Sequence, residues 1–425
     1  MNDAEPRSFA LPFGKHSLRV ELRGDLIEPK RARAVGDETR AVEEALARPI
    51  GTPPLREIVH IGERVAIIVN DITRLTRTDL ILPPVVNTLN AAGIPDSDIF
   101  IVFALGIHRP QTDKERRLIV GDEIWRRLRM FDHISTDDSN LIEVGTTSFG
   151  NRVEINRQVW DADRIILTGE IIYHLIAGYS GGRKSLVPGV AGFRTTTFNH
   201  RMIFDPRCRP GLLDGNPAHE DLMEACCMVD PDFIINVVLE PGGKLVRVVA
   251  GHWELAHREG CKTVDEMLRV DVDEQYDLIV ASAGGFPVDI DLRQAHKGLE
   301  NACLALRPGG SILFYAECSN GAGIKSFEEY VSRYNDENEM KAALEREFVV
   351  GGHKAYWVTR LGRLYDVRLV SVLPHEFVRR CHFTPVAVEE HEHVLAQVIE
   401  KNAGAKVAVI PHASFTLPAV AAMVQ

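Results

Sequence analysis

The sequence has no long apolar run and no apolar stretch behind a basic start. No run of about eighteen apolar residues occurs in its 425 residues, whereas a membrane-spanning helix needs about twenty. A secretory leader would show a basic start followed by a short apolar core, and the first residues show neither. We therefore predict neither a leader nor a membrane span, and no membrane partner.

Paired cysteine motifs and an excess of basic charge are also missing. The seven cysteines are odd in number, scattered, and never spaced as Cys-x-x-Cys. This pattern suits a reducing compartment and offers no thiolate zinc site, so we expect a cytoplasmic protein. The net charge of -11 opposes a nucleic-acid partner, because the overall field repels a polyanion.

The sequence does contain buried-strand patterns that alternate with helical ones. Apolar, β-branched runs occur at 65–70, 99–105, 164–168 and 233–239, and a second series begins at Asp277. Strands of this kind predict a parallel sheet covered on both faces. Because 425 residues are too many for one ordinary core, we predict an α/β fold of two domains. Each should have a mainly parallel sheet flanked by helices.

The boundary between these domains is predicted from charge. The acidic stretch Asp265–Tyr276 is the best linker candidate, so residues 1–272 are expected to form an N-terminal α/β domain. Residues 273–404 are expected to form a C-terminal α/β domain. The final segment, 405–425, is expected to return to the first domain as a strand.

Three loops with unusual polar residues follow the predicted strands of the first domain. They are 70–74, 105–110 and 169–185. In open parallel sheets, ligands bind outside the carboxyl ends of the strands. All three loops are therefore expected to converge on one crevice.

The third loop contains a glycine-rich segment that runs from Gly178 to Ser185. Glycines permit positive φ and let backbone N–H groups approach an anion such as phosphate. Lys184 and Ser185 resemble the end of a P-loop, but that motif has glycine before the lysine and this chain has Arg183. A tight turn in a buried loop is the plain alternative, and the two adjacent cations favour anion binding.

Histidines mark two of these loops and the region after them. A lone histidine such as His108 or His174 is usually a structural residue, whereas two facing one cleft would form an acid–base pair. His200 would be a hydrogen-bonded loop residue or a single metal ligand. No second ligand lies at helical spacing from it, which disfavours a metal cage built by the protein alone.

In the second domain, polar residues open the predicted helix 291–306. Gln294 and Lys297 are three residues apart and share a helical face. A solvated first turn is the ordinary explanation. A carboxylate clamp is the alternative, because free N–H groups at a helix N-terminus attract an anion.

Together these loops resemble the lactate racemase family, whose enzymes use a nickel-pincer nucleotide. Three motifs support the resemblance, and their order and separations also match: Asp71-x-Thr73-Arg74, Gly106-x-His108-Arg109-Pro110, and His174-x-x-Ala177-Gly178-Tyr179-Ser180-Gly181-Gly182-x-Lys184-Ser185. The resemblance spans most of the chain. It implies a 2-hydroxyacid racemase, an isomerase that interconverts D and L enantiomers by hydride transfer to and from the cofactor. The active site would lie in the cleft between the domains.

The resemblance also implies a role for each candidate residue. The cofactor, a pyridinium-3,5-bisthiocarboxylic acid mononucleotide with nickel, would be linked covalently to Lys184 in a cofactor-binding N-terminal domain. His200 would be the metal ligand, and His108 and His174 the catalytic acid/base residues. The other cofactor-binding candidates are Asp71, Thr73, Gly178, Tyr179, Ser180, Gly181, Gly182 and Ser185. The substrate-binding candidates are Arg74, Gln294, Lys297, Arg293 and Trp357. The expected partners are a small 2-hydroxy acid, the cofactor-building enzymes and a second copy in a homodimer.

One position departs from the expected pattern, and it leaves the substrate open. Arg293 stands where lactate-specific members are expected to have an aromatic residue. An extra cation would serve a second carboxylate, as in malate, or face solvent, and an aromatic hydroxy acid is a further alternative.

Two other classes of protein compete with the racemase hypothesis. A nucleotide-dependent kinase or synthetase built on 178–185 is opposed by the failed P-loop spacing and by the lack of an obvious magnesium-binding carboxylate pair. A non-catalytic carboxylate-binding protein would bind its ligand without needing His108 or His174.

Overall fold

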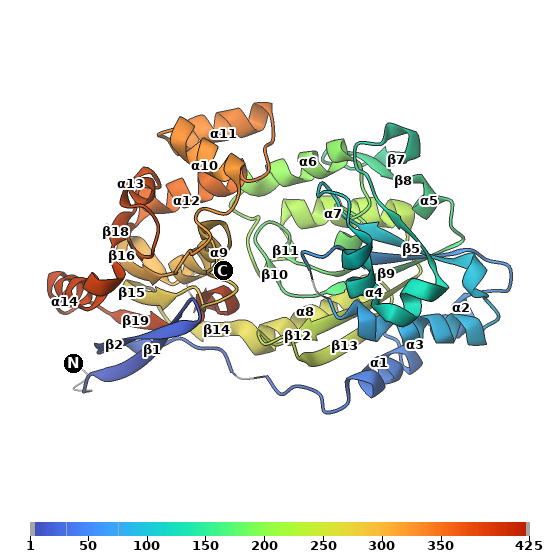
Figure 1. Cartoon of the computed structure of the whole chain (residues 1–425), viewed down its shortest axis with the longest axis horizontal. Helices are drawn as coiled ribbons and strands as arrows, with labels where there is room; N and C mark the ends of the chain where they lie inside the picture. The colour runs from blue at the N-terminus through green and yellow to red at the C-terminus, as the bar shows by residue number, and fades with distance from the viewer. Residues whose placement is uncertain (1–4, 31, 75, 422–425) are drawn as a thin grey trace. The chain divides into compact units, whose positions relative to one another are not determined.

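A computed structural model of the chain describes residues 5–30, 32–74 and 76–421. These residues form two compact units. We call residues 32–266 the central unit, and residues 5–30 together with 267–421 the terminal unit. Both units are α/β structures with a six-stranded sheet (Figure 1), as the alternating strand and helix patterns predict.

The sheet of the central unit has the strand order β13-β12-β9-β4-β5-β6. Its strands are β4 (Val65–Asn70), β5 (Ile99–Ala104), β6 (Arg129–Asp132), β9 (Arg164–Glu170), β12 (Phe233–Leu239) and β13 (Leu245–Gly251). Only β12 and β13 are antiparallel neighbours. The middle strands are buried along nearly their whole length. Because helices cover both faces of the sheet, polar residues do not alternate with apolar ones along these strands.

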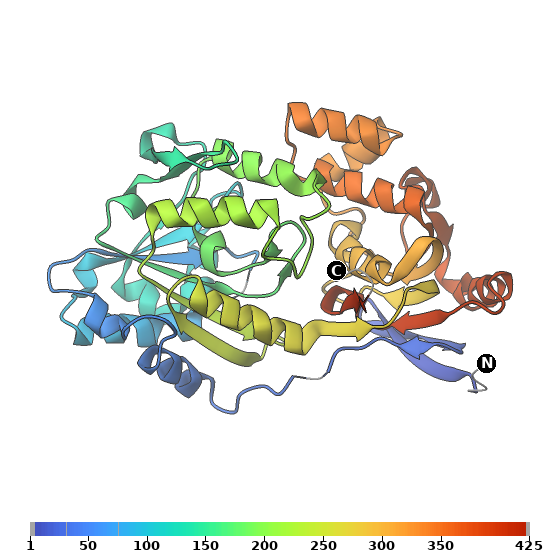
Figure 2. The ribbon, with the colours of Figure 1, turned by 180° about the vertical axis from the view of Figure 1, so that it is seen from behind.

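Helices cover both faces of this sheet. Four of them share one apolar core with the strands: α1 (Glu38–Ala47), α2 (Leu55–Ile58), α3 (Thr78–Ala91) and α4 (Asp113–Arg127). Helices α7 (Pro217–Val229) and α8 (Leu255–Leu268) lie over the opposite face (Figure 2). Helix α4 begins at a capping box of Thr112 and Glu115, which satisfies its first free N–H groups.

The sheet of the terminal unit is parallel throughout, in the order β18-β17-β16-β15-β19-β3. Its strands are β3 (Asp25–Leu26), β15 (Tyr276–Ser282), β16 (Leu306–Tyr315), β17 (Asp366–Val370), β18 (Thr384–Val386) and β19 (Val407–Ile410). A separate parallel pair joins β14 (Arg269–Val272) to β20 (Leu417–Val420). The helices of this unit are α9 (Leu292–Leu304), α10 (Lys325–Arg333), α11 (Glu337–Arg346), α12 (Gly352–Leu364), α13 (His375–Arg380) and α14 (His391–Lys401).

The two ends of the chain correct the predicted domain boundaries. The hairpin of β1 (Arg7–Phe13) and β2 (His16–Leu22) packs its apolar residues against the sheet of the terminal unit. Strand β19 pairs with β15 in that sheet. Residues 5–30 and strands β19 and β20 therefore belong with the terminal unit, and the prediction that 405–425 joins the first domain is wrong. Apolar periodicity shows that a strand is buried but not which neighbour it pairs with. Residues 422–425 of the predicted segment lie outside the described residues.

Across the part of the chain that the structure describes, no helix combines the length and the apolar composition that crossing a membrane would require.

Candidate functional site

The three polar loops follow strands that are neighbours in the sheet of the central unit. Strand β4 lies between β9 and β5, and all three run parallel. Their carboxyl ends therefore reach the same edge, where the strand order changes direction and open α/β sheets bind ligands. The predicted convergence of the loops is confirmed.

The loops after β4 and β5 form a histidine–carboxylate pair. Nδ1 of His108 lies 2.6 Å from Oδ2 of the buried Asp71, whose other oxygen accepts a hydrogen bond from Thr73. With the carboxylate accepting the Nδ1 proton, the neutral ring has its lone pair at Nε2. Asp71 thus orients the ring through Nδ1, and the His108 side chain remains 47% exposed to solvent. Asp71, which was expected to bind the cofactor, holds His108 in this structure, and Thr73, another cofactor-binding candidate, donates to Asp71.

The loop after β9 presents His174 on a short hairpin. Strand β10 (Tyr173–His174) pairs with β11 (Gly178–Tyr179), and Nδ1 of His174 accepts hydrogen bonds from the amides of Ile176 and Ala177. The neutral ring therefore has its proton on Nε2. Burial, followed by the nearby charges of Lys184 and Arg74, holds the pKa of His174 well below its usual value. His108 thus presents an acceptor and His174 presents a donor.

Lys184 lies on a 3-10 turn, Gly182–Ser185, that directly follows this hairpin. Burial lowers the pKa of its amine well below the ordinary value for lysine, and the positive charges of Arg74 and Arg183 lower it further. Such surroundings favour the neutral amine, which is the nucleophilic form.

His200 lies in the last turn of α6 (Phe193–Arg201). Its Nδ1 donates to the carbonyl of Thr196 at 2.8 Å, which places the lone pair of the neutral ring at Nε2. Burial, together with the charge of Lys184, lowers the pKa of His200 to about 4. The imidazole is therefore neutral at physiological pH, as a metal ligand must be.

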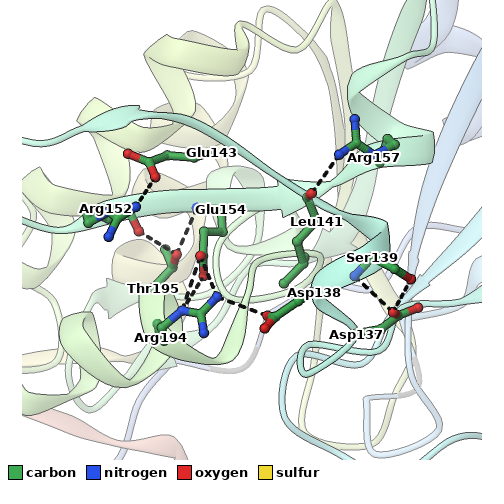
Figure 3. A network of polar contacts seen from close by, with 10 residues as sticks. All are labelled: Asp137, Asp138, Ser139, Leu141, Glu143, Arg152, Glu154, Arg157, Arg194 and Thr195. Carbon is green, nitrogen blue, oxygen red and sulfur yellow. Dashed lines mark hydrogen bonds and ion pairs between the residues drawn. The ribbon is translucent and has the colours of Figure 1, made fainter.

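The first turn of α6 is fixed by ion pairs and hydrogen bonds to the hairpin of β7 (Leu141–Thr146) and β8 (Arg152–Asn156) (Figure 3). Arg194 contacts Glu154 at 2.8 Å and Asp138 at 2.9 Å. The hydroxyl of Thr195 donates to the carbonyl of Arg152 and accepts from the amide of Glu154. The start of the helix is thus tied down, which fixes the direction in which its last turn presents His200.

These side chains share one electrostatic environment. Arg74 is exposed after β4, and its charge acts on His174, Lys184 and His200. Burial raises the pKa of Glu170, the last residue of β9, to about 7, while Arg74 opposes that rise. The predicted grouping of His108, His174, Lys184 and His200 is therefore present within the central unit, and Glu170 adds a carboxyl group that sequence analysis had not singled out.

The glycine-rich segment is built mainly by hydrogen bonds internal to the protein. The amides of Ser180 and Gly182 bond to Ile172 and Asn236, and the Tyr179 hydroxyl bonds to Asp265. The hydroxyls of Ser180 and Ser185 donate to backbone carbonyls of β9. In this structure these groups shape the loop that presents Lys184, and a role in holding phosphate stays a prediction.

Two of the glycines are required by space and backbone conformation. Gly178 has φ of 74°, and a Cβ there would collide with the carbonyl oxygen of Leu212. Gly182 has φ of 52°, and a Cβ there would lie 2.9 Å from the ring of His257. The loop therefore needs glycine to pack at all, whatever it binds.

Arg183 does not face an anion-binding surface. Its side chain is buried, with Nη1 2.9 Å from Nε2 of His257 and Nη2 donating to the carbonyl of Ala177. Burial lowers the pKa of this guanidinium to about 10. Of the two cations beside the glycines, Arg183 is thus directed into the protein.

The other predicted substrate contacts lie in the terminal unit. Gln294 and Lys297 are in the first turns of α9, and the Lys297 amine donates to Oε1 of Gln294 at 2.7 Å. The expectation that they share a helical face is confirmed. Arg293 precedes them on α9, and Trp357 lies on α12, which contacts α9.

Three further residues position the site and were not identified from sequence. Asn236 accepts a hydrogen bond from the amide of Gly182, and His257 contacts the carbonyl of Ser180. Asp265 accepts hydrogen bonds from two tyrosine hydroxyls of the hairpin. Asn236 is the one polar residue in the otherwise apolar strand Phe233–Leu239, a signal that could have found it. His257 and Asp265 give no such signal, because polar residues are ordinary on a helix.

The fold and the site define an α/β enzyme in which two histidines share one environment with a half-buried lysine of lowered pKa and a half-buried neutral imidazole. Comparison with known proteins identifies its family. Residues 13–211 match the lactate racemase N-terminal domain, and residues 272–415 match the lactate racemase C-terminal domain. The chain belongs to the lactate racemase family and is a racemase, an isomerase.

Individual relatives agree with this assignment. The chain is 30% identical to the lactate racemase of Thermoanaerobacterium thermosaccharolyticum, over 94% of this chain and 96% of that protein. It is 35% identical to the lactate racemase of Lactiplantibacillus plantarum, over 78% and 79%. The apoprotein structure of the T. thermosaccharolyticum enzyme superposes with a TM-score of 0.87, covering 97% of this chain and all of that one. A Thermotoga maritima protein at 17% identity and a TM-score of 0.65 shares the fold.

Proposed function

We propose that this chain racemises a small 2-hydroxy acid of the lactate class, with His108 and His174 as the proton-transferring residues. The observation that supports this most directly is the complementary state of the two rings. Nδ1 of His108 donates a hydrogen bond to Asp71, whereas Nδ1 of His174 accepts hydrogen bonds from two amides. The pair therefore offers one proton acceptor and one proton donor. Racemisation needs both, because the hydroxyl of one enantiomer must lose a proton and the hydroxyl of the other must gain one.

The residues present fit the nickel-pincer nucleotide that the family resemblance implies. Lys184 supplies an amine for a covalent link, and burial with two neighbouring cations lowers its pKa, which favours the nucleophilic neutral form. Nδ1 of His200 donates to the carbonyl of Thr196, so the lone pair of the neutral ring is at Nε2, the atom that would ligate nickel. One imidazole is sufficient when the cofactor provides the other, sulfur-rich ligands. The described residues contain no group of three or more His, Cys, Asp or Glu side chains able to hold a metal by themselves.

When bound, this cofactor would accept and return the hydride of the substrate. The protein's own task is proton traffic and orientation. His108 takes the hydroxyl proton at Nε2, and Asp71 stabilises the imidazolium that results. His174 serves the hydroxyl of the opposite enantiomer. We assign the substrate carboxylate to Gln294 and Lys297, and Arg74 adds positive charge beside the histidines.

The direct test is to produce the chain together with the cofactor-building enzymes and offer it pure D- or L-lactate. Chiral chromatography should show each enantiomer converting to the racemate. Apoprotein made without those enzymes is the control and should convert neither. Binding of lactate without conversion by a fully loaded chain would favour the carboxylate-binding alternative instead.

Replacing His200 by alanine should remove nickel while the fold is kept. We expect nickel per chain and racemisation to fall by about tenfold to a hundredfold or more, because losses of that size follow even from mutations of outer-shell partners. Elemental mass spectrometry measures the nickel content per chain and tests whether His200 is a nickel ligand. His393→Ala changes an exposed histidine of α14 and should leave nickel unchanged. Full occupancy with normal turnover in His200→Ala would contradict the assignment.

A second candidate substrate is a dicarboxylate such as malate. Arg293, Lys297 and Lys354 form a cationic cluster on α9 and α12. The amine of Lys354 lies 3.5 Å from the carbonyl of Arg293, and burial, together with Lys297 and Arg293, lowers its pKa to about 7. Lys354 was not identified from sequence. A cluster of this kind could hold a second carboxylate, although Asp291 and Glu300 lie nearby.

Exchange of Arg293 for tyrosine should separate the two substrates. If Arg293 binds a second carboxylate, kcat/KM for malate falls about tenfold or more, because a hydrogen bond to a charged group contributes about 1.5–3 kcal/mol. Turnover of lactate should hold or rise. Arg346→Tyr, an exposed arginine at the end of α11, is the matched control. Equal changes for malate, lactate and an aromatic hydroxy acid would remove Arg293 from substrate selection.

A further inference from the structure

One face of α8 lies against the segment that presents His174 and Lys184. His257, Cys261 and Asp265 are spaced four residues apart on this helix, so they share a face. His257 contacts the carbonyl of Ser180 at 2.9 Å, and Gly260 on the same helix packs against Ile171. Asp265 reaches the hairpin itself.

The Asp265 carboxylate closes the base of that hairpin. Its Oδ1 accepts a hydrogen bond of 2.7 Å from the Tyr173 hydroxyl and one of 2.6 Å from the Tyr179 hydroxyl. These tyrosines are cross-strand partners in the β10–β11 ladder, and their ring centroids are 5.3 Å apart. One oxygen on α8 thus holds both strands of the hairpin.

The backbone pairing between β10 and β11 is too short to stabilise the hairpin by itself. The pairing comprises two residue pairs, Tyr173–Tyr179 and His174–Gly178, and isolated two-stranded hairpins are marginally stable at best in water. Two amides within the turn orient the His174 ring by hydrogen bonds to its Nδ1. Wherever the hairpin moves, the imidazole moves with it.

We propose that Asp265 is a positioning residue for His174, acting through the hydroxyls of Tyr173 and Tyr179. This inference rests on the proposed role of His174 in proton transfer. Misplacement of a reacting group by about 1 Å can cost a hundredfold in rate, so the anchor is expected to influence turnover although Asp265 does not touch the substrate. His108 has its own carboxylate partner in Asp71 and should not depend on Asp265.

Amide hydrogen exchange on the apoprotein tests the anchor without any cofactor. In Asp265→Ala, amides of residues 172–182 should exchange about tenfold faster or more, because the hairpin opens locally. Asp265→Asn keeps an acceptor oxygen and should restore most of the protection. Thr263→Ala, on the same helix, is the matched control, since it removes the hydrogen bond that Thr263 accepts from Arg247 of β13 without touching the hairpin. Unchanged exchange in Asp265→Ala, or an equal change in Thr263→Ala, would overturn the proposal.

The loaded enzyme gives a second readout that a merely structural role would not move. Half-reactions with each pure enantiomer, normalised to nickel content, should slow by about tenfold to a hundredfold for the enantiomer that His174→Ala abolishes. The other enantiomer should react at its normal rate, and KM should change little. Equal slowing of both enantiomers would refute positioning of His174. If the loaded wild-type chain racemises no hydroxy acid, the proposed function fails, and the exchange experiment still decides whether Asp265 holds the hairpin.

Discussion

Replacing Lys184 by alanine should abolish both the covalent cofactor adduct and racemisation. The intact mass of protein produced with the cofactor-building enzymes should fall to that of the polypeptide. The reason is chemical, because a covalent link needs a nucleophilic neutral amine, and burial with two adjacent cations favours that form of Lys184 by lowering its pKa. Circular dichroism should be unchanged, since Lys184 is not part of the apolar core.

Substitution of Lys184 by arginine distinguishes the need for a nucleophile from the need for a positive charge at this position. Lys184→Arg keeps a cation of similar length but does not supply a neutral amine, because the guanidinium stays protonated. It should therefore lose the adduct as completely as Lys184→Ala. Lys262→Ala, an exposed lysine of α8, is the control and should keep the full adduct mass. An adduct that persisted in both Lys184 variants would show that the cofactor is attached elsewhere.

Removing either His108 or His174 should suppress full racemisation by about 10²–10⁴-fold, the usual contribution of a general acid or base. Each turnover uses both residues, so each single loss is sufficient. The half-reactions should differ between the two variants. With one histidine gone, one enantiomer should still yield the keto acid, and the other variant should show the opposite preference. Rapid mixing of loaded enzyme with each pure enantiomer, followed by cofactor absorbance, measures this.

The controls for this experiment are also in the chain. His393→Ala should leave both half-reactions intact. Asp71→Asn should weaken the half-reaction that depends on His108 and spare the other, because Asp71 orients only that ring. If both histidine variants lost both enantiomers equally, the two-base scheme would be wrong. One histidine would then be assigned to orienting the substrate or the metal site.

Sequence patterns determined the class of fold and most of the chemistry of the site. Apolar strands such as Val65–Asn70 can be buried only in a sheet covered on both sides, and the loops after them can only meet at one edge. His108, His174 and Lys184 were found because each follows such a strand within a matching motif, and His200 was singled out as a metal ligand through the family resemblance. Their grouping in the central unit is shown by the structure, and their individual roles stay predictions.

Only the tertiary structure decided which segments belong together and what holds each group in place. Residues 5–30 and strand β19 belong to the terminal unit because strand pairing depends on contacts far apart in the sequence. The protonation pattern of the two histidines came from Asp71 and from the turn amides of residues 176 and 177. Asp265 became part of the site through two hydroxyls some ninety residues away. Local composition predicts burial and periodicity, but a hydrogen bond between distant segments exists only once the chain has folded.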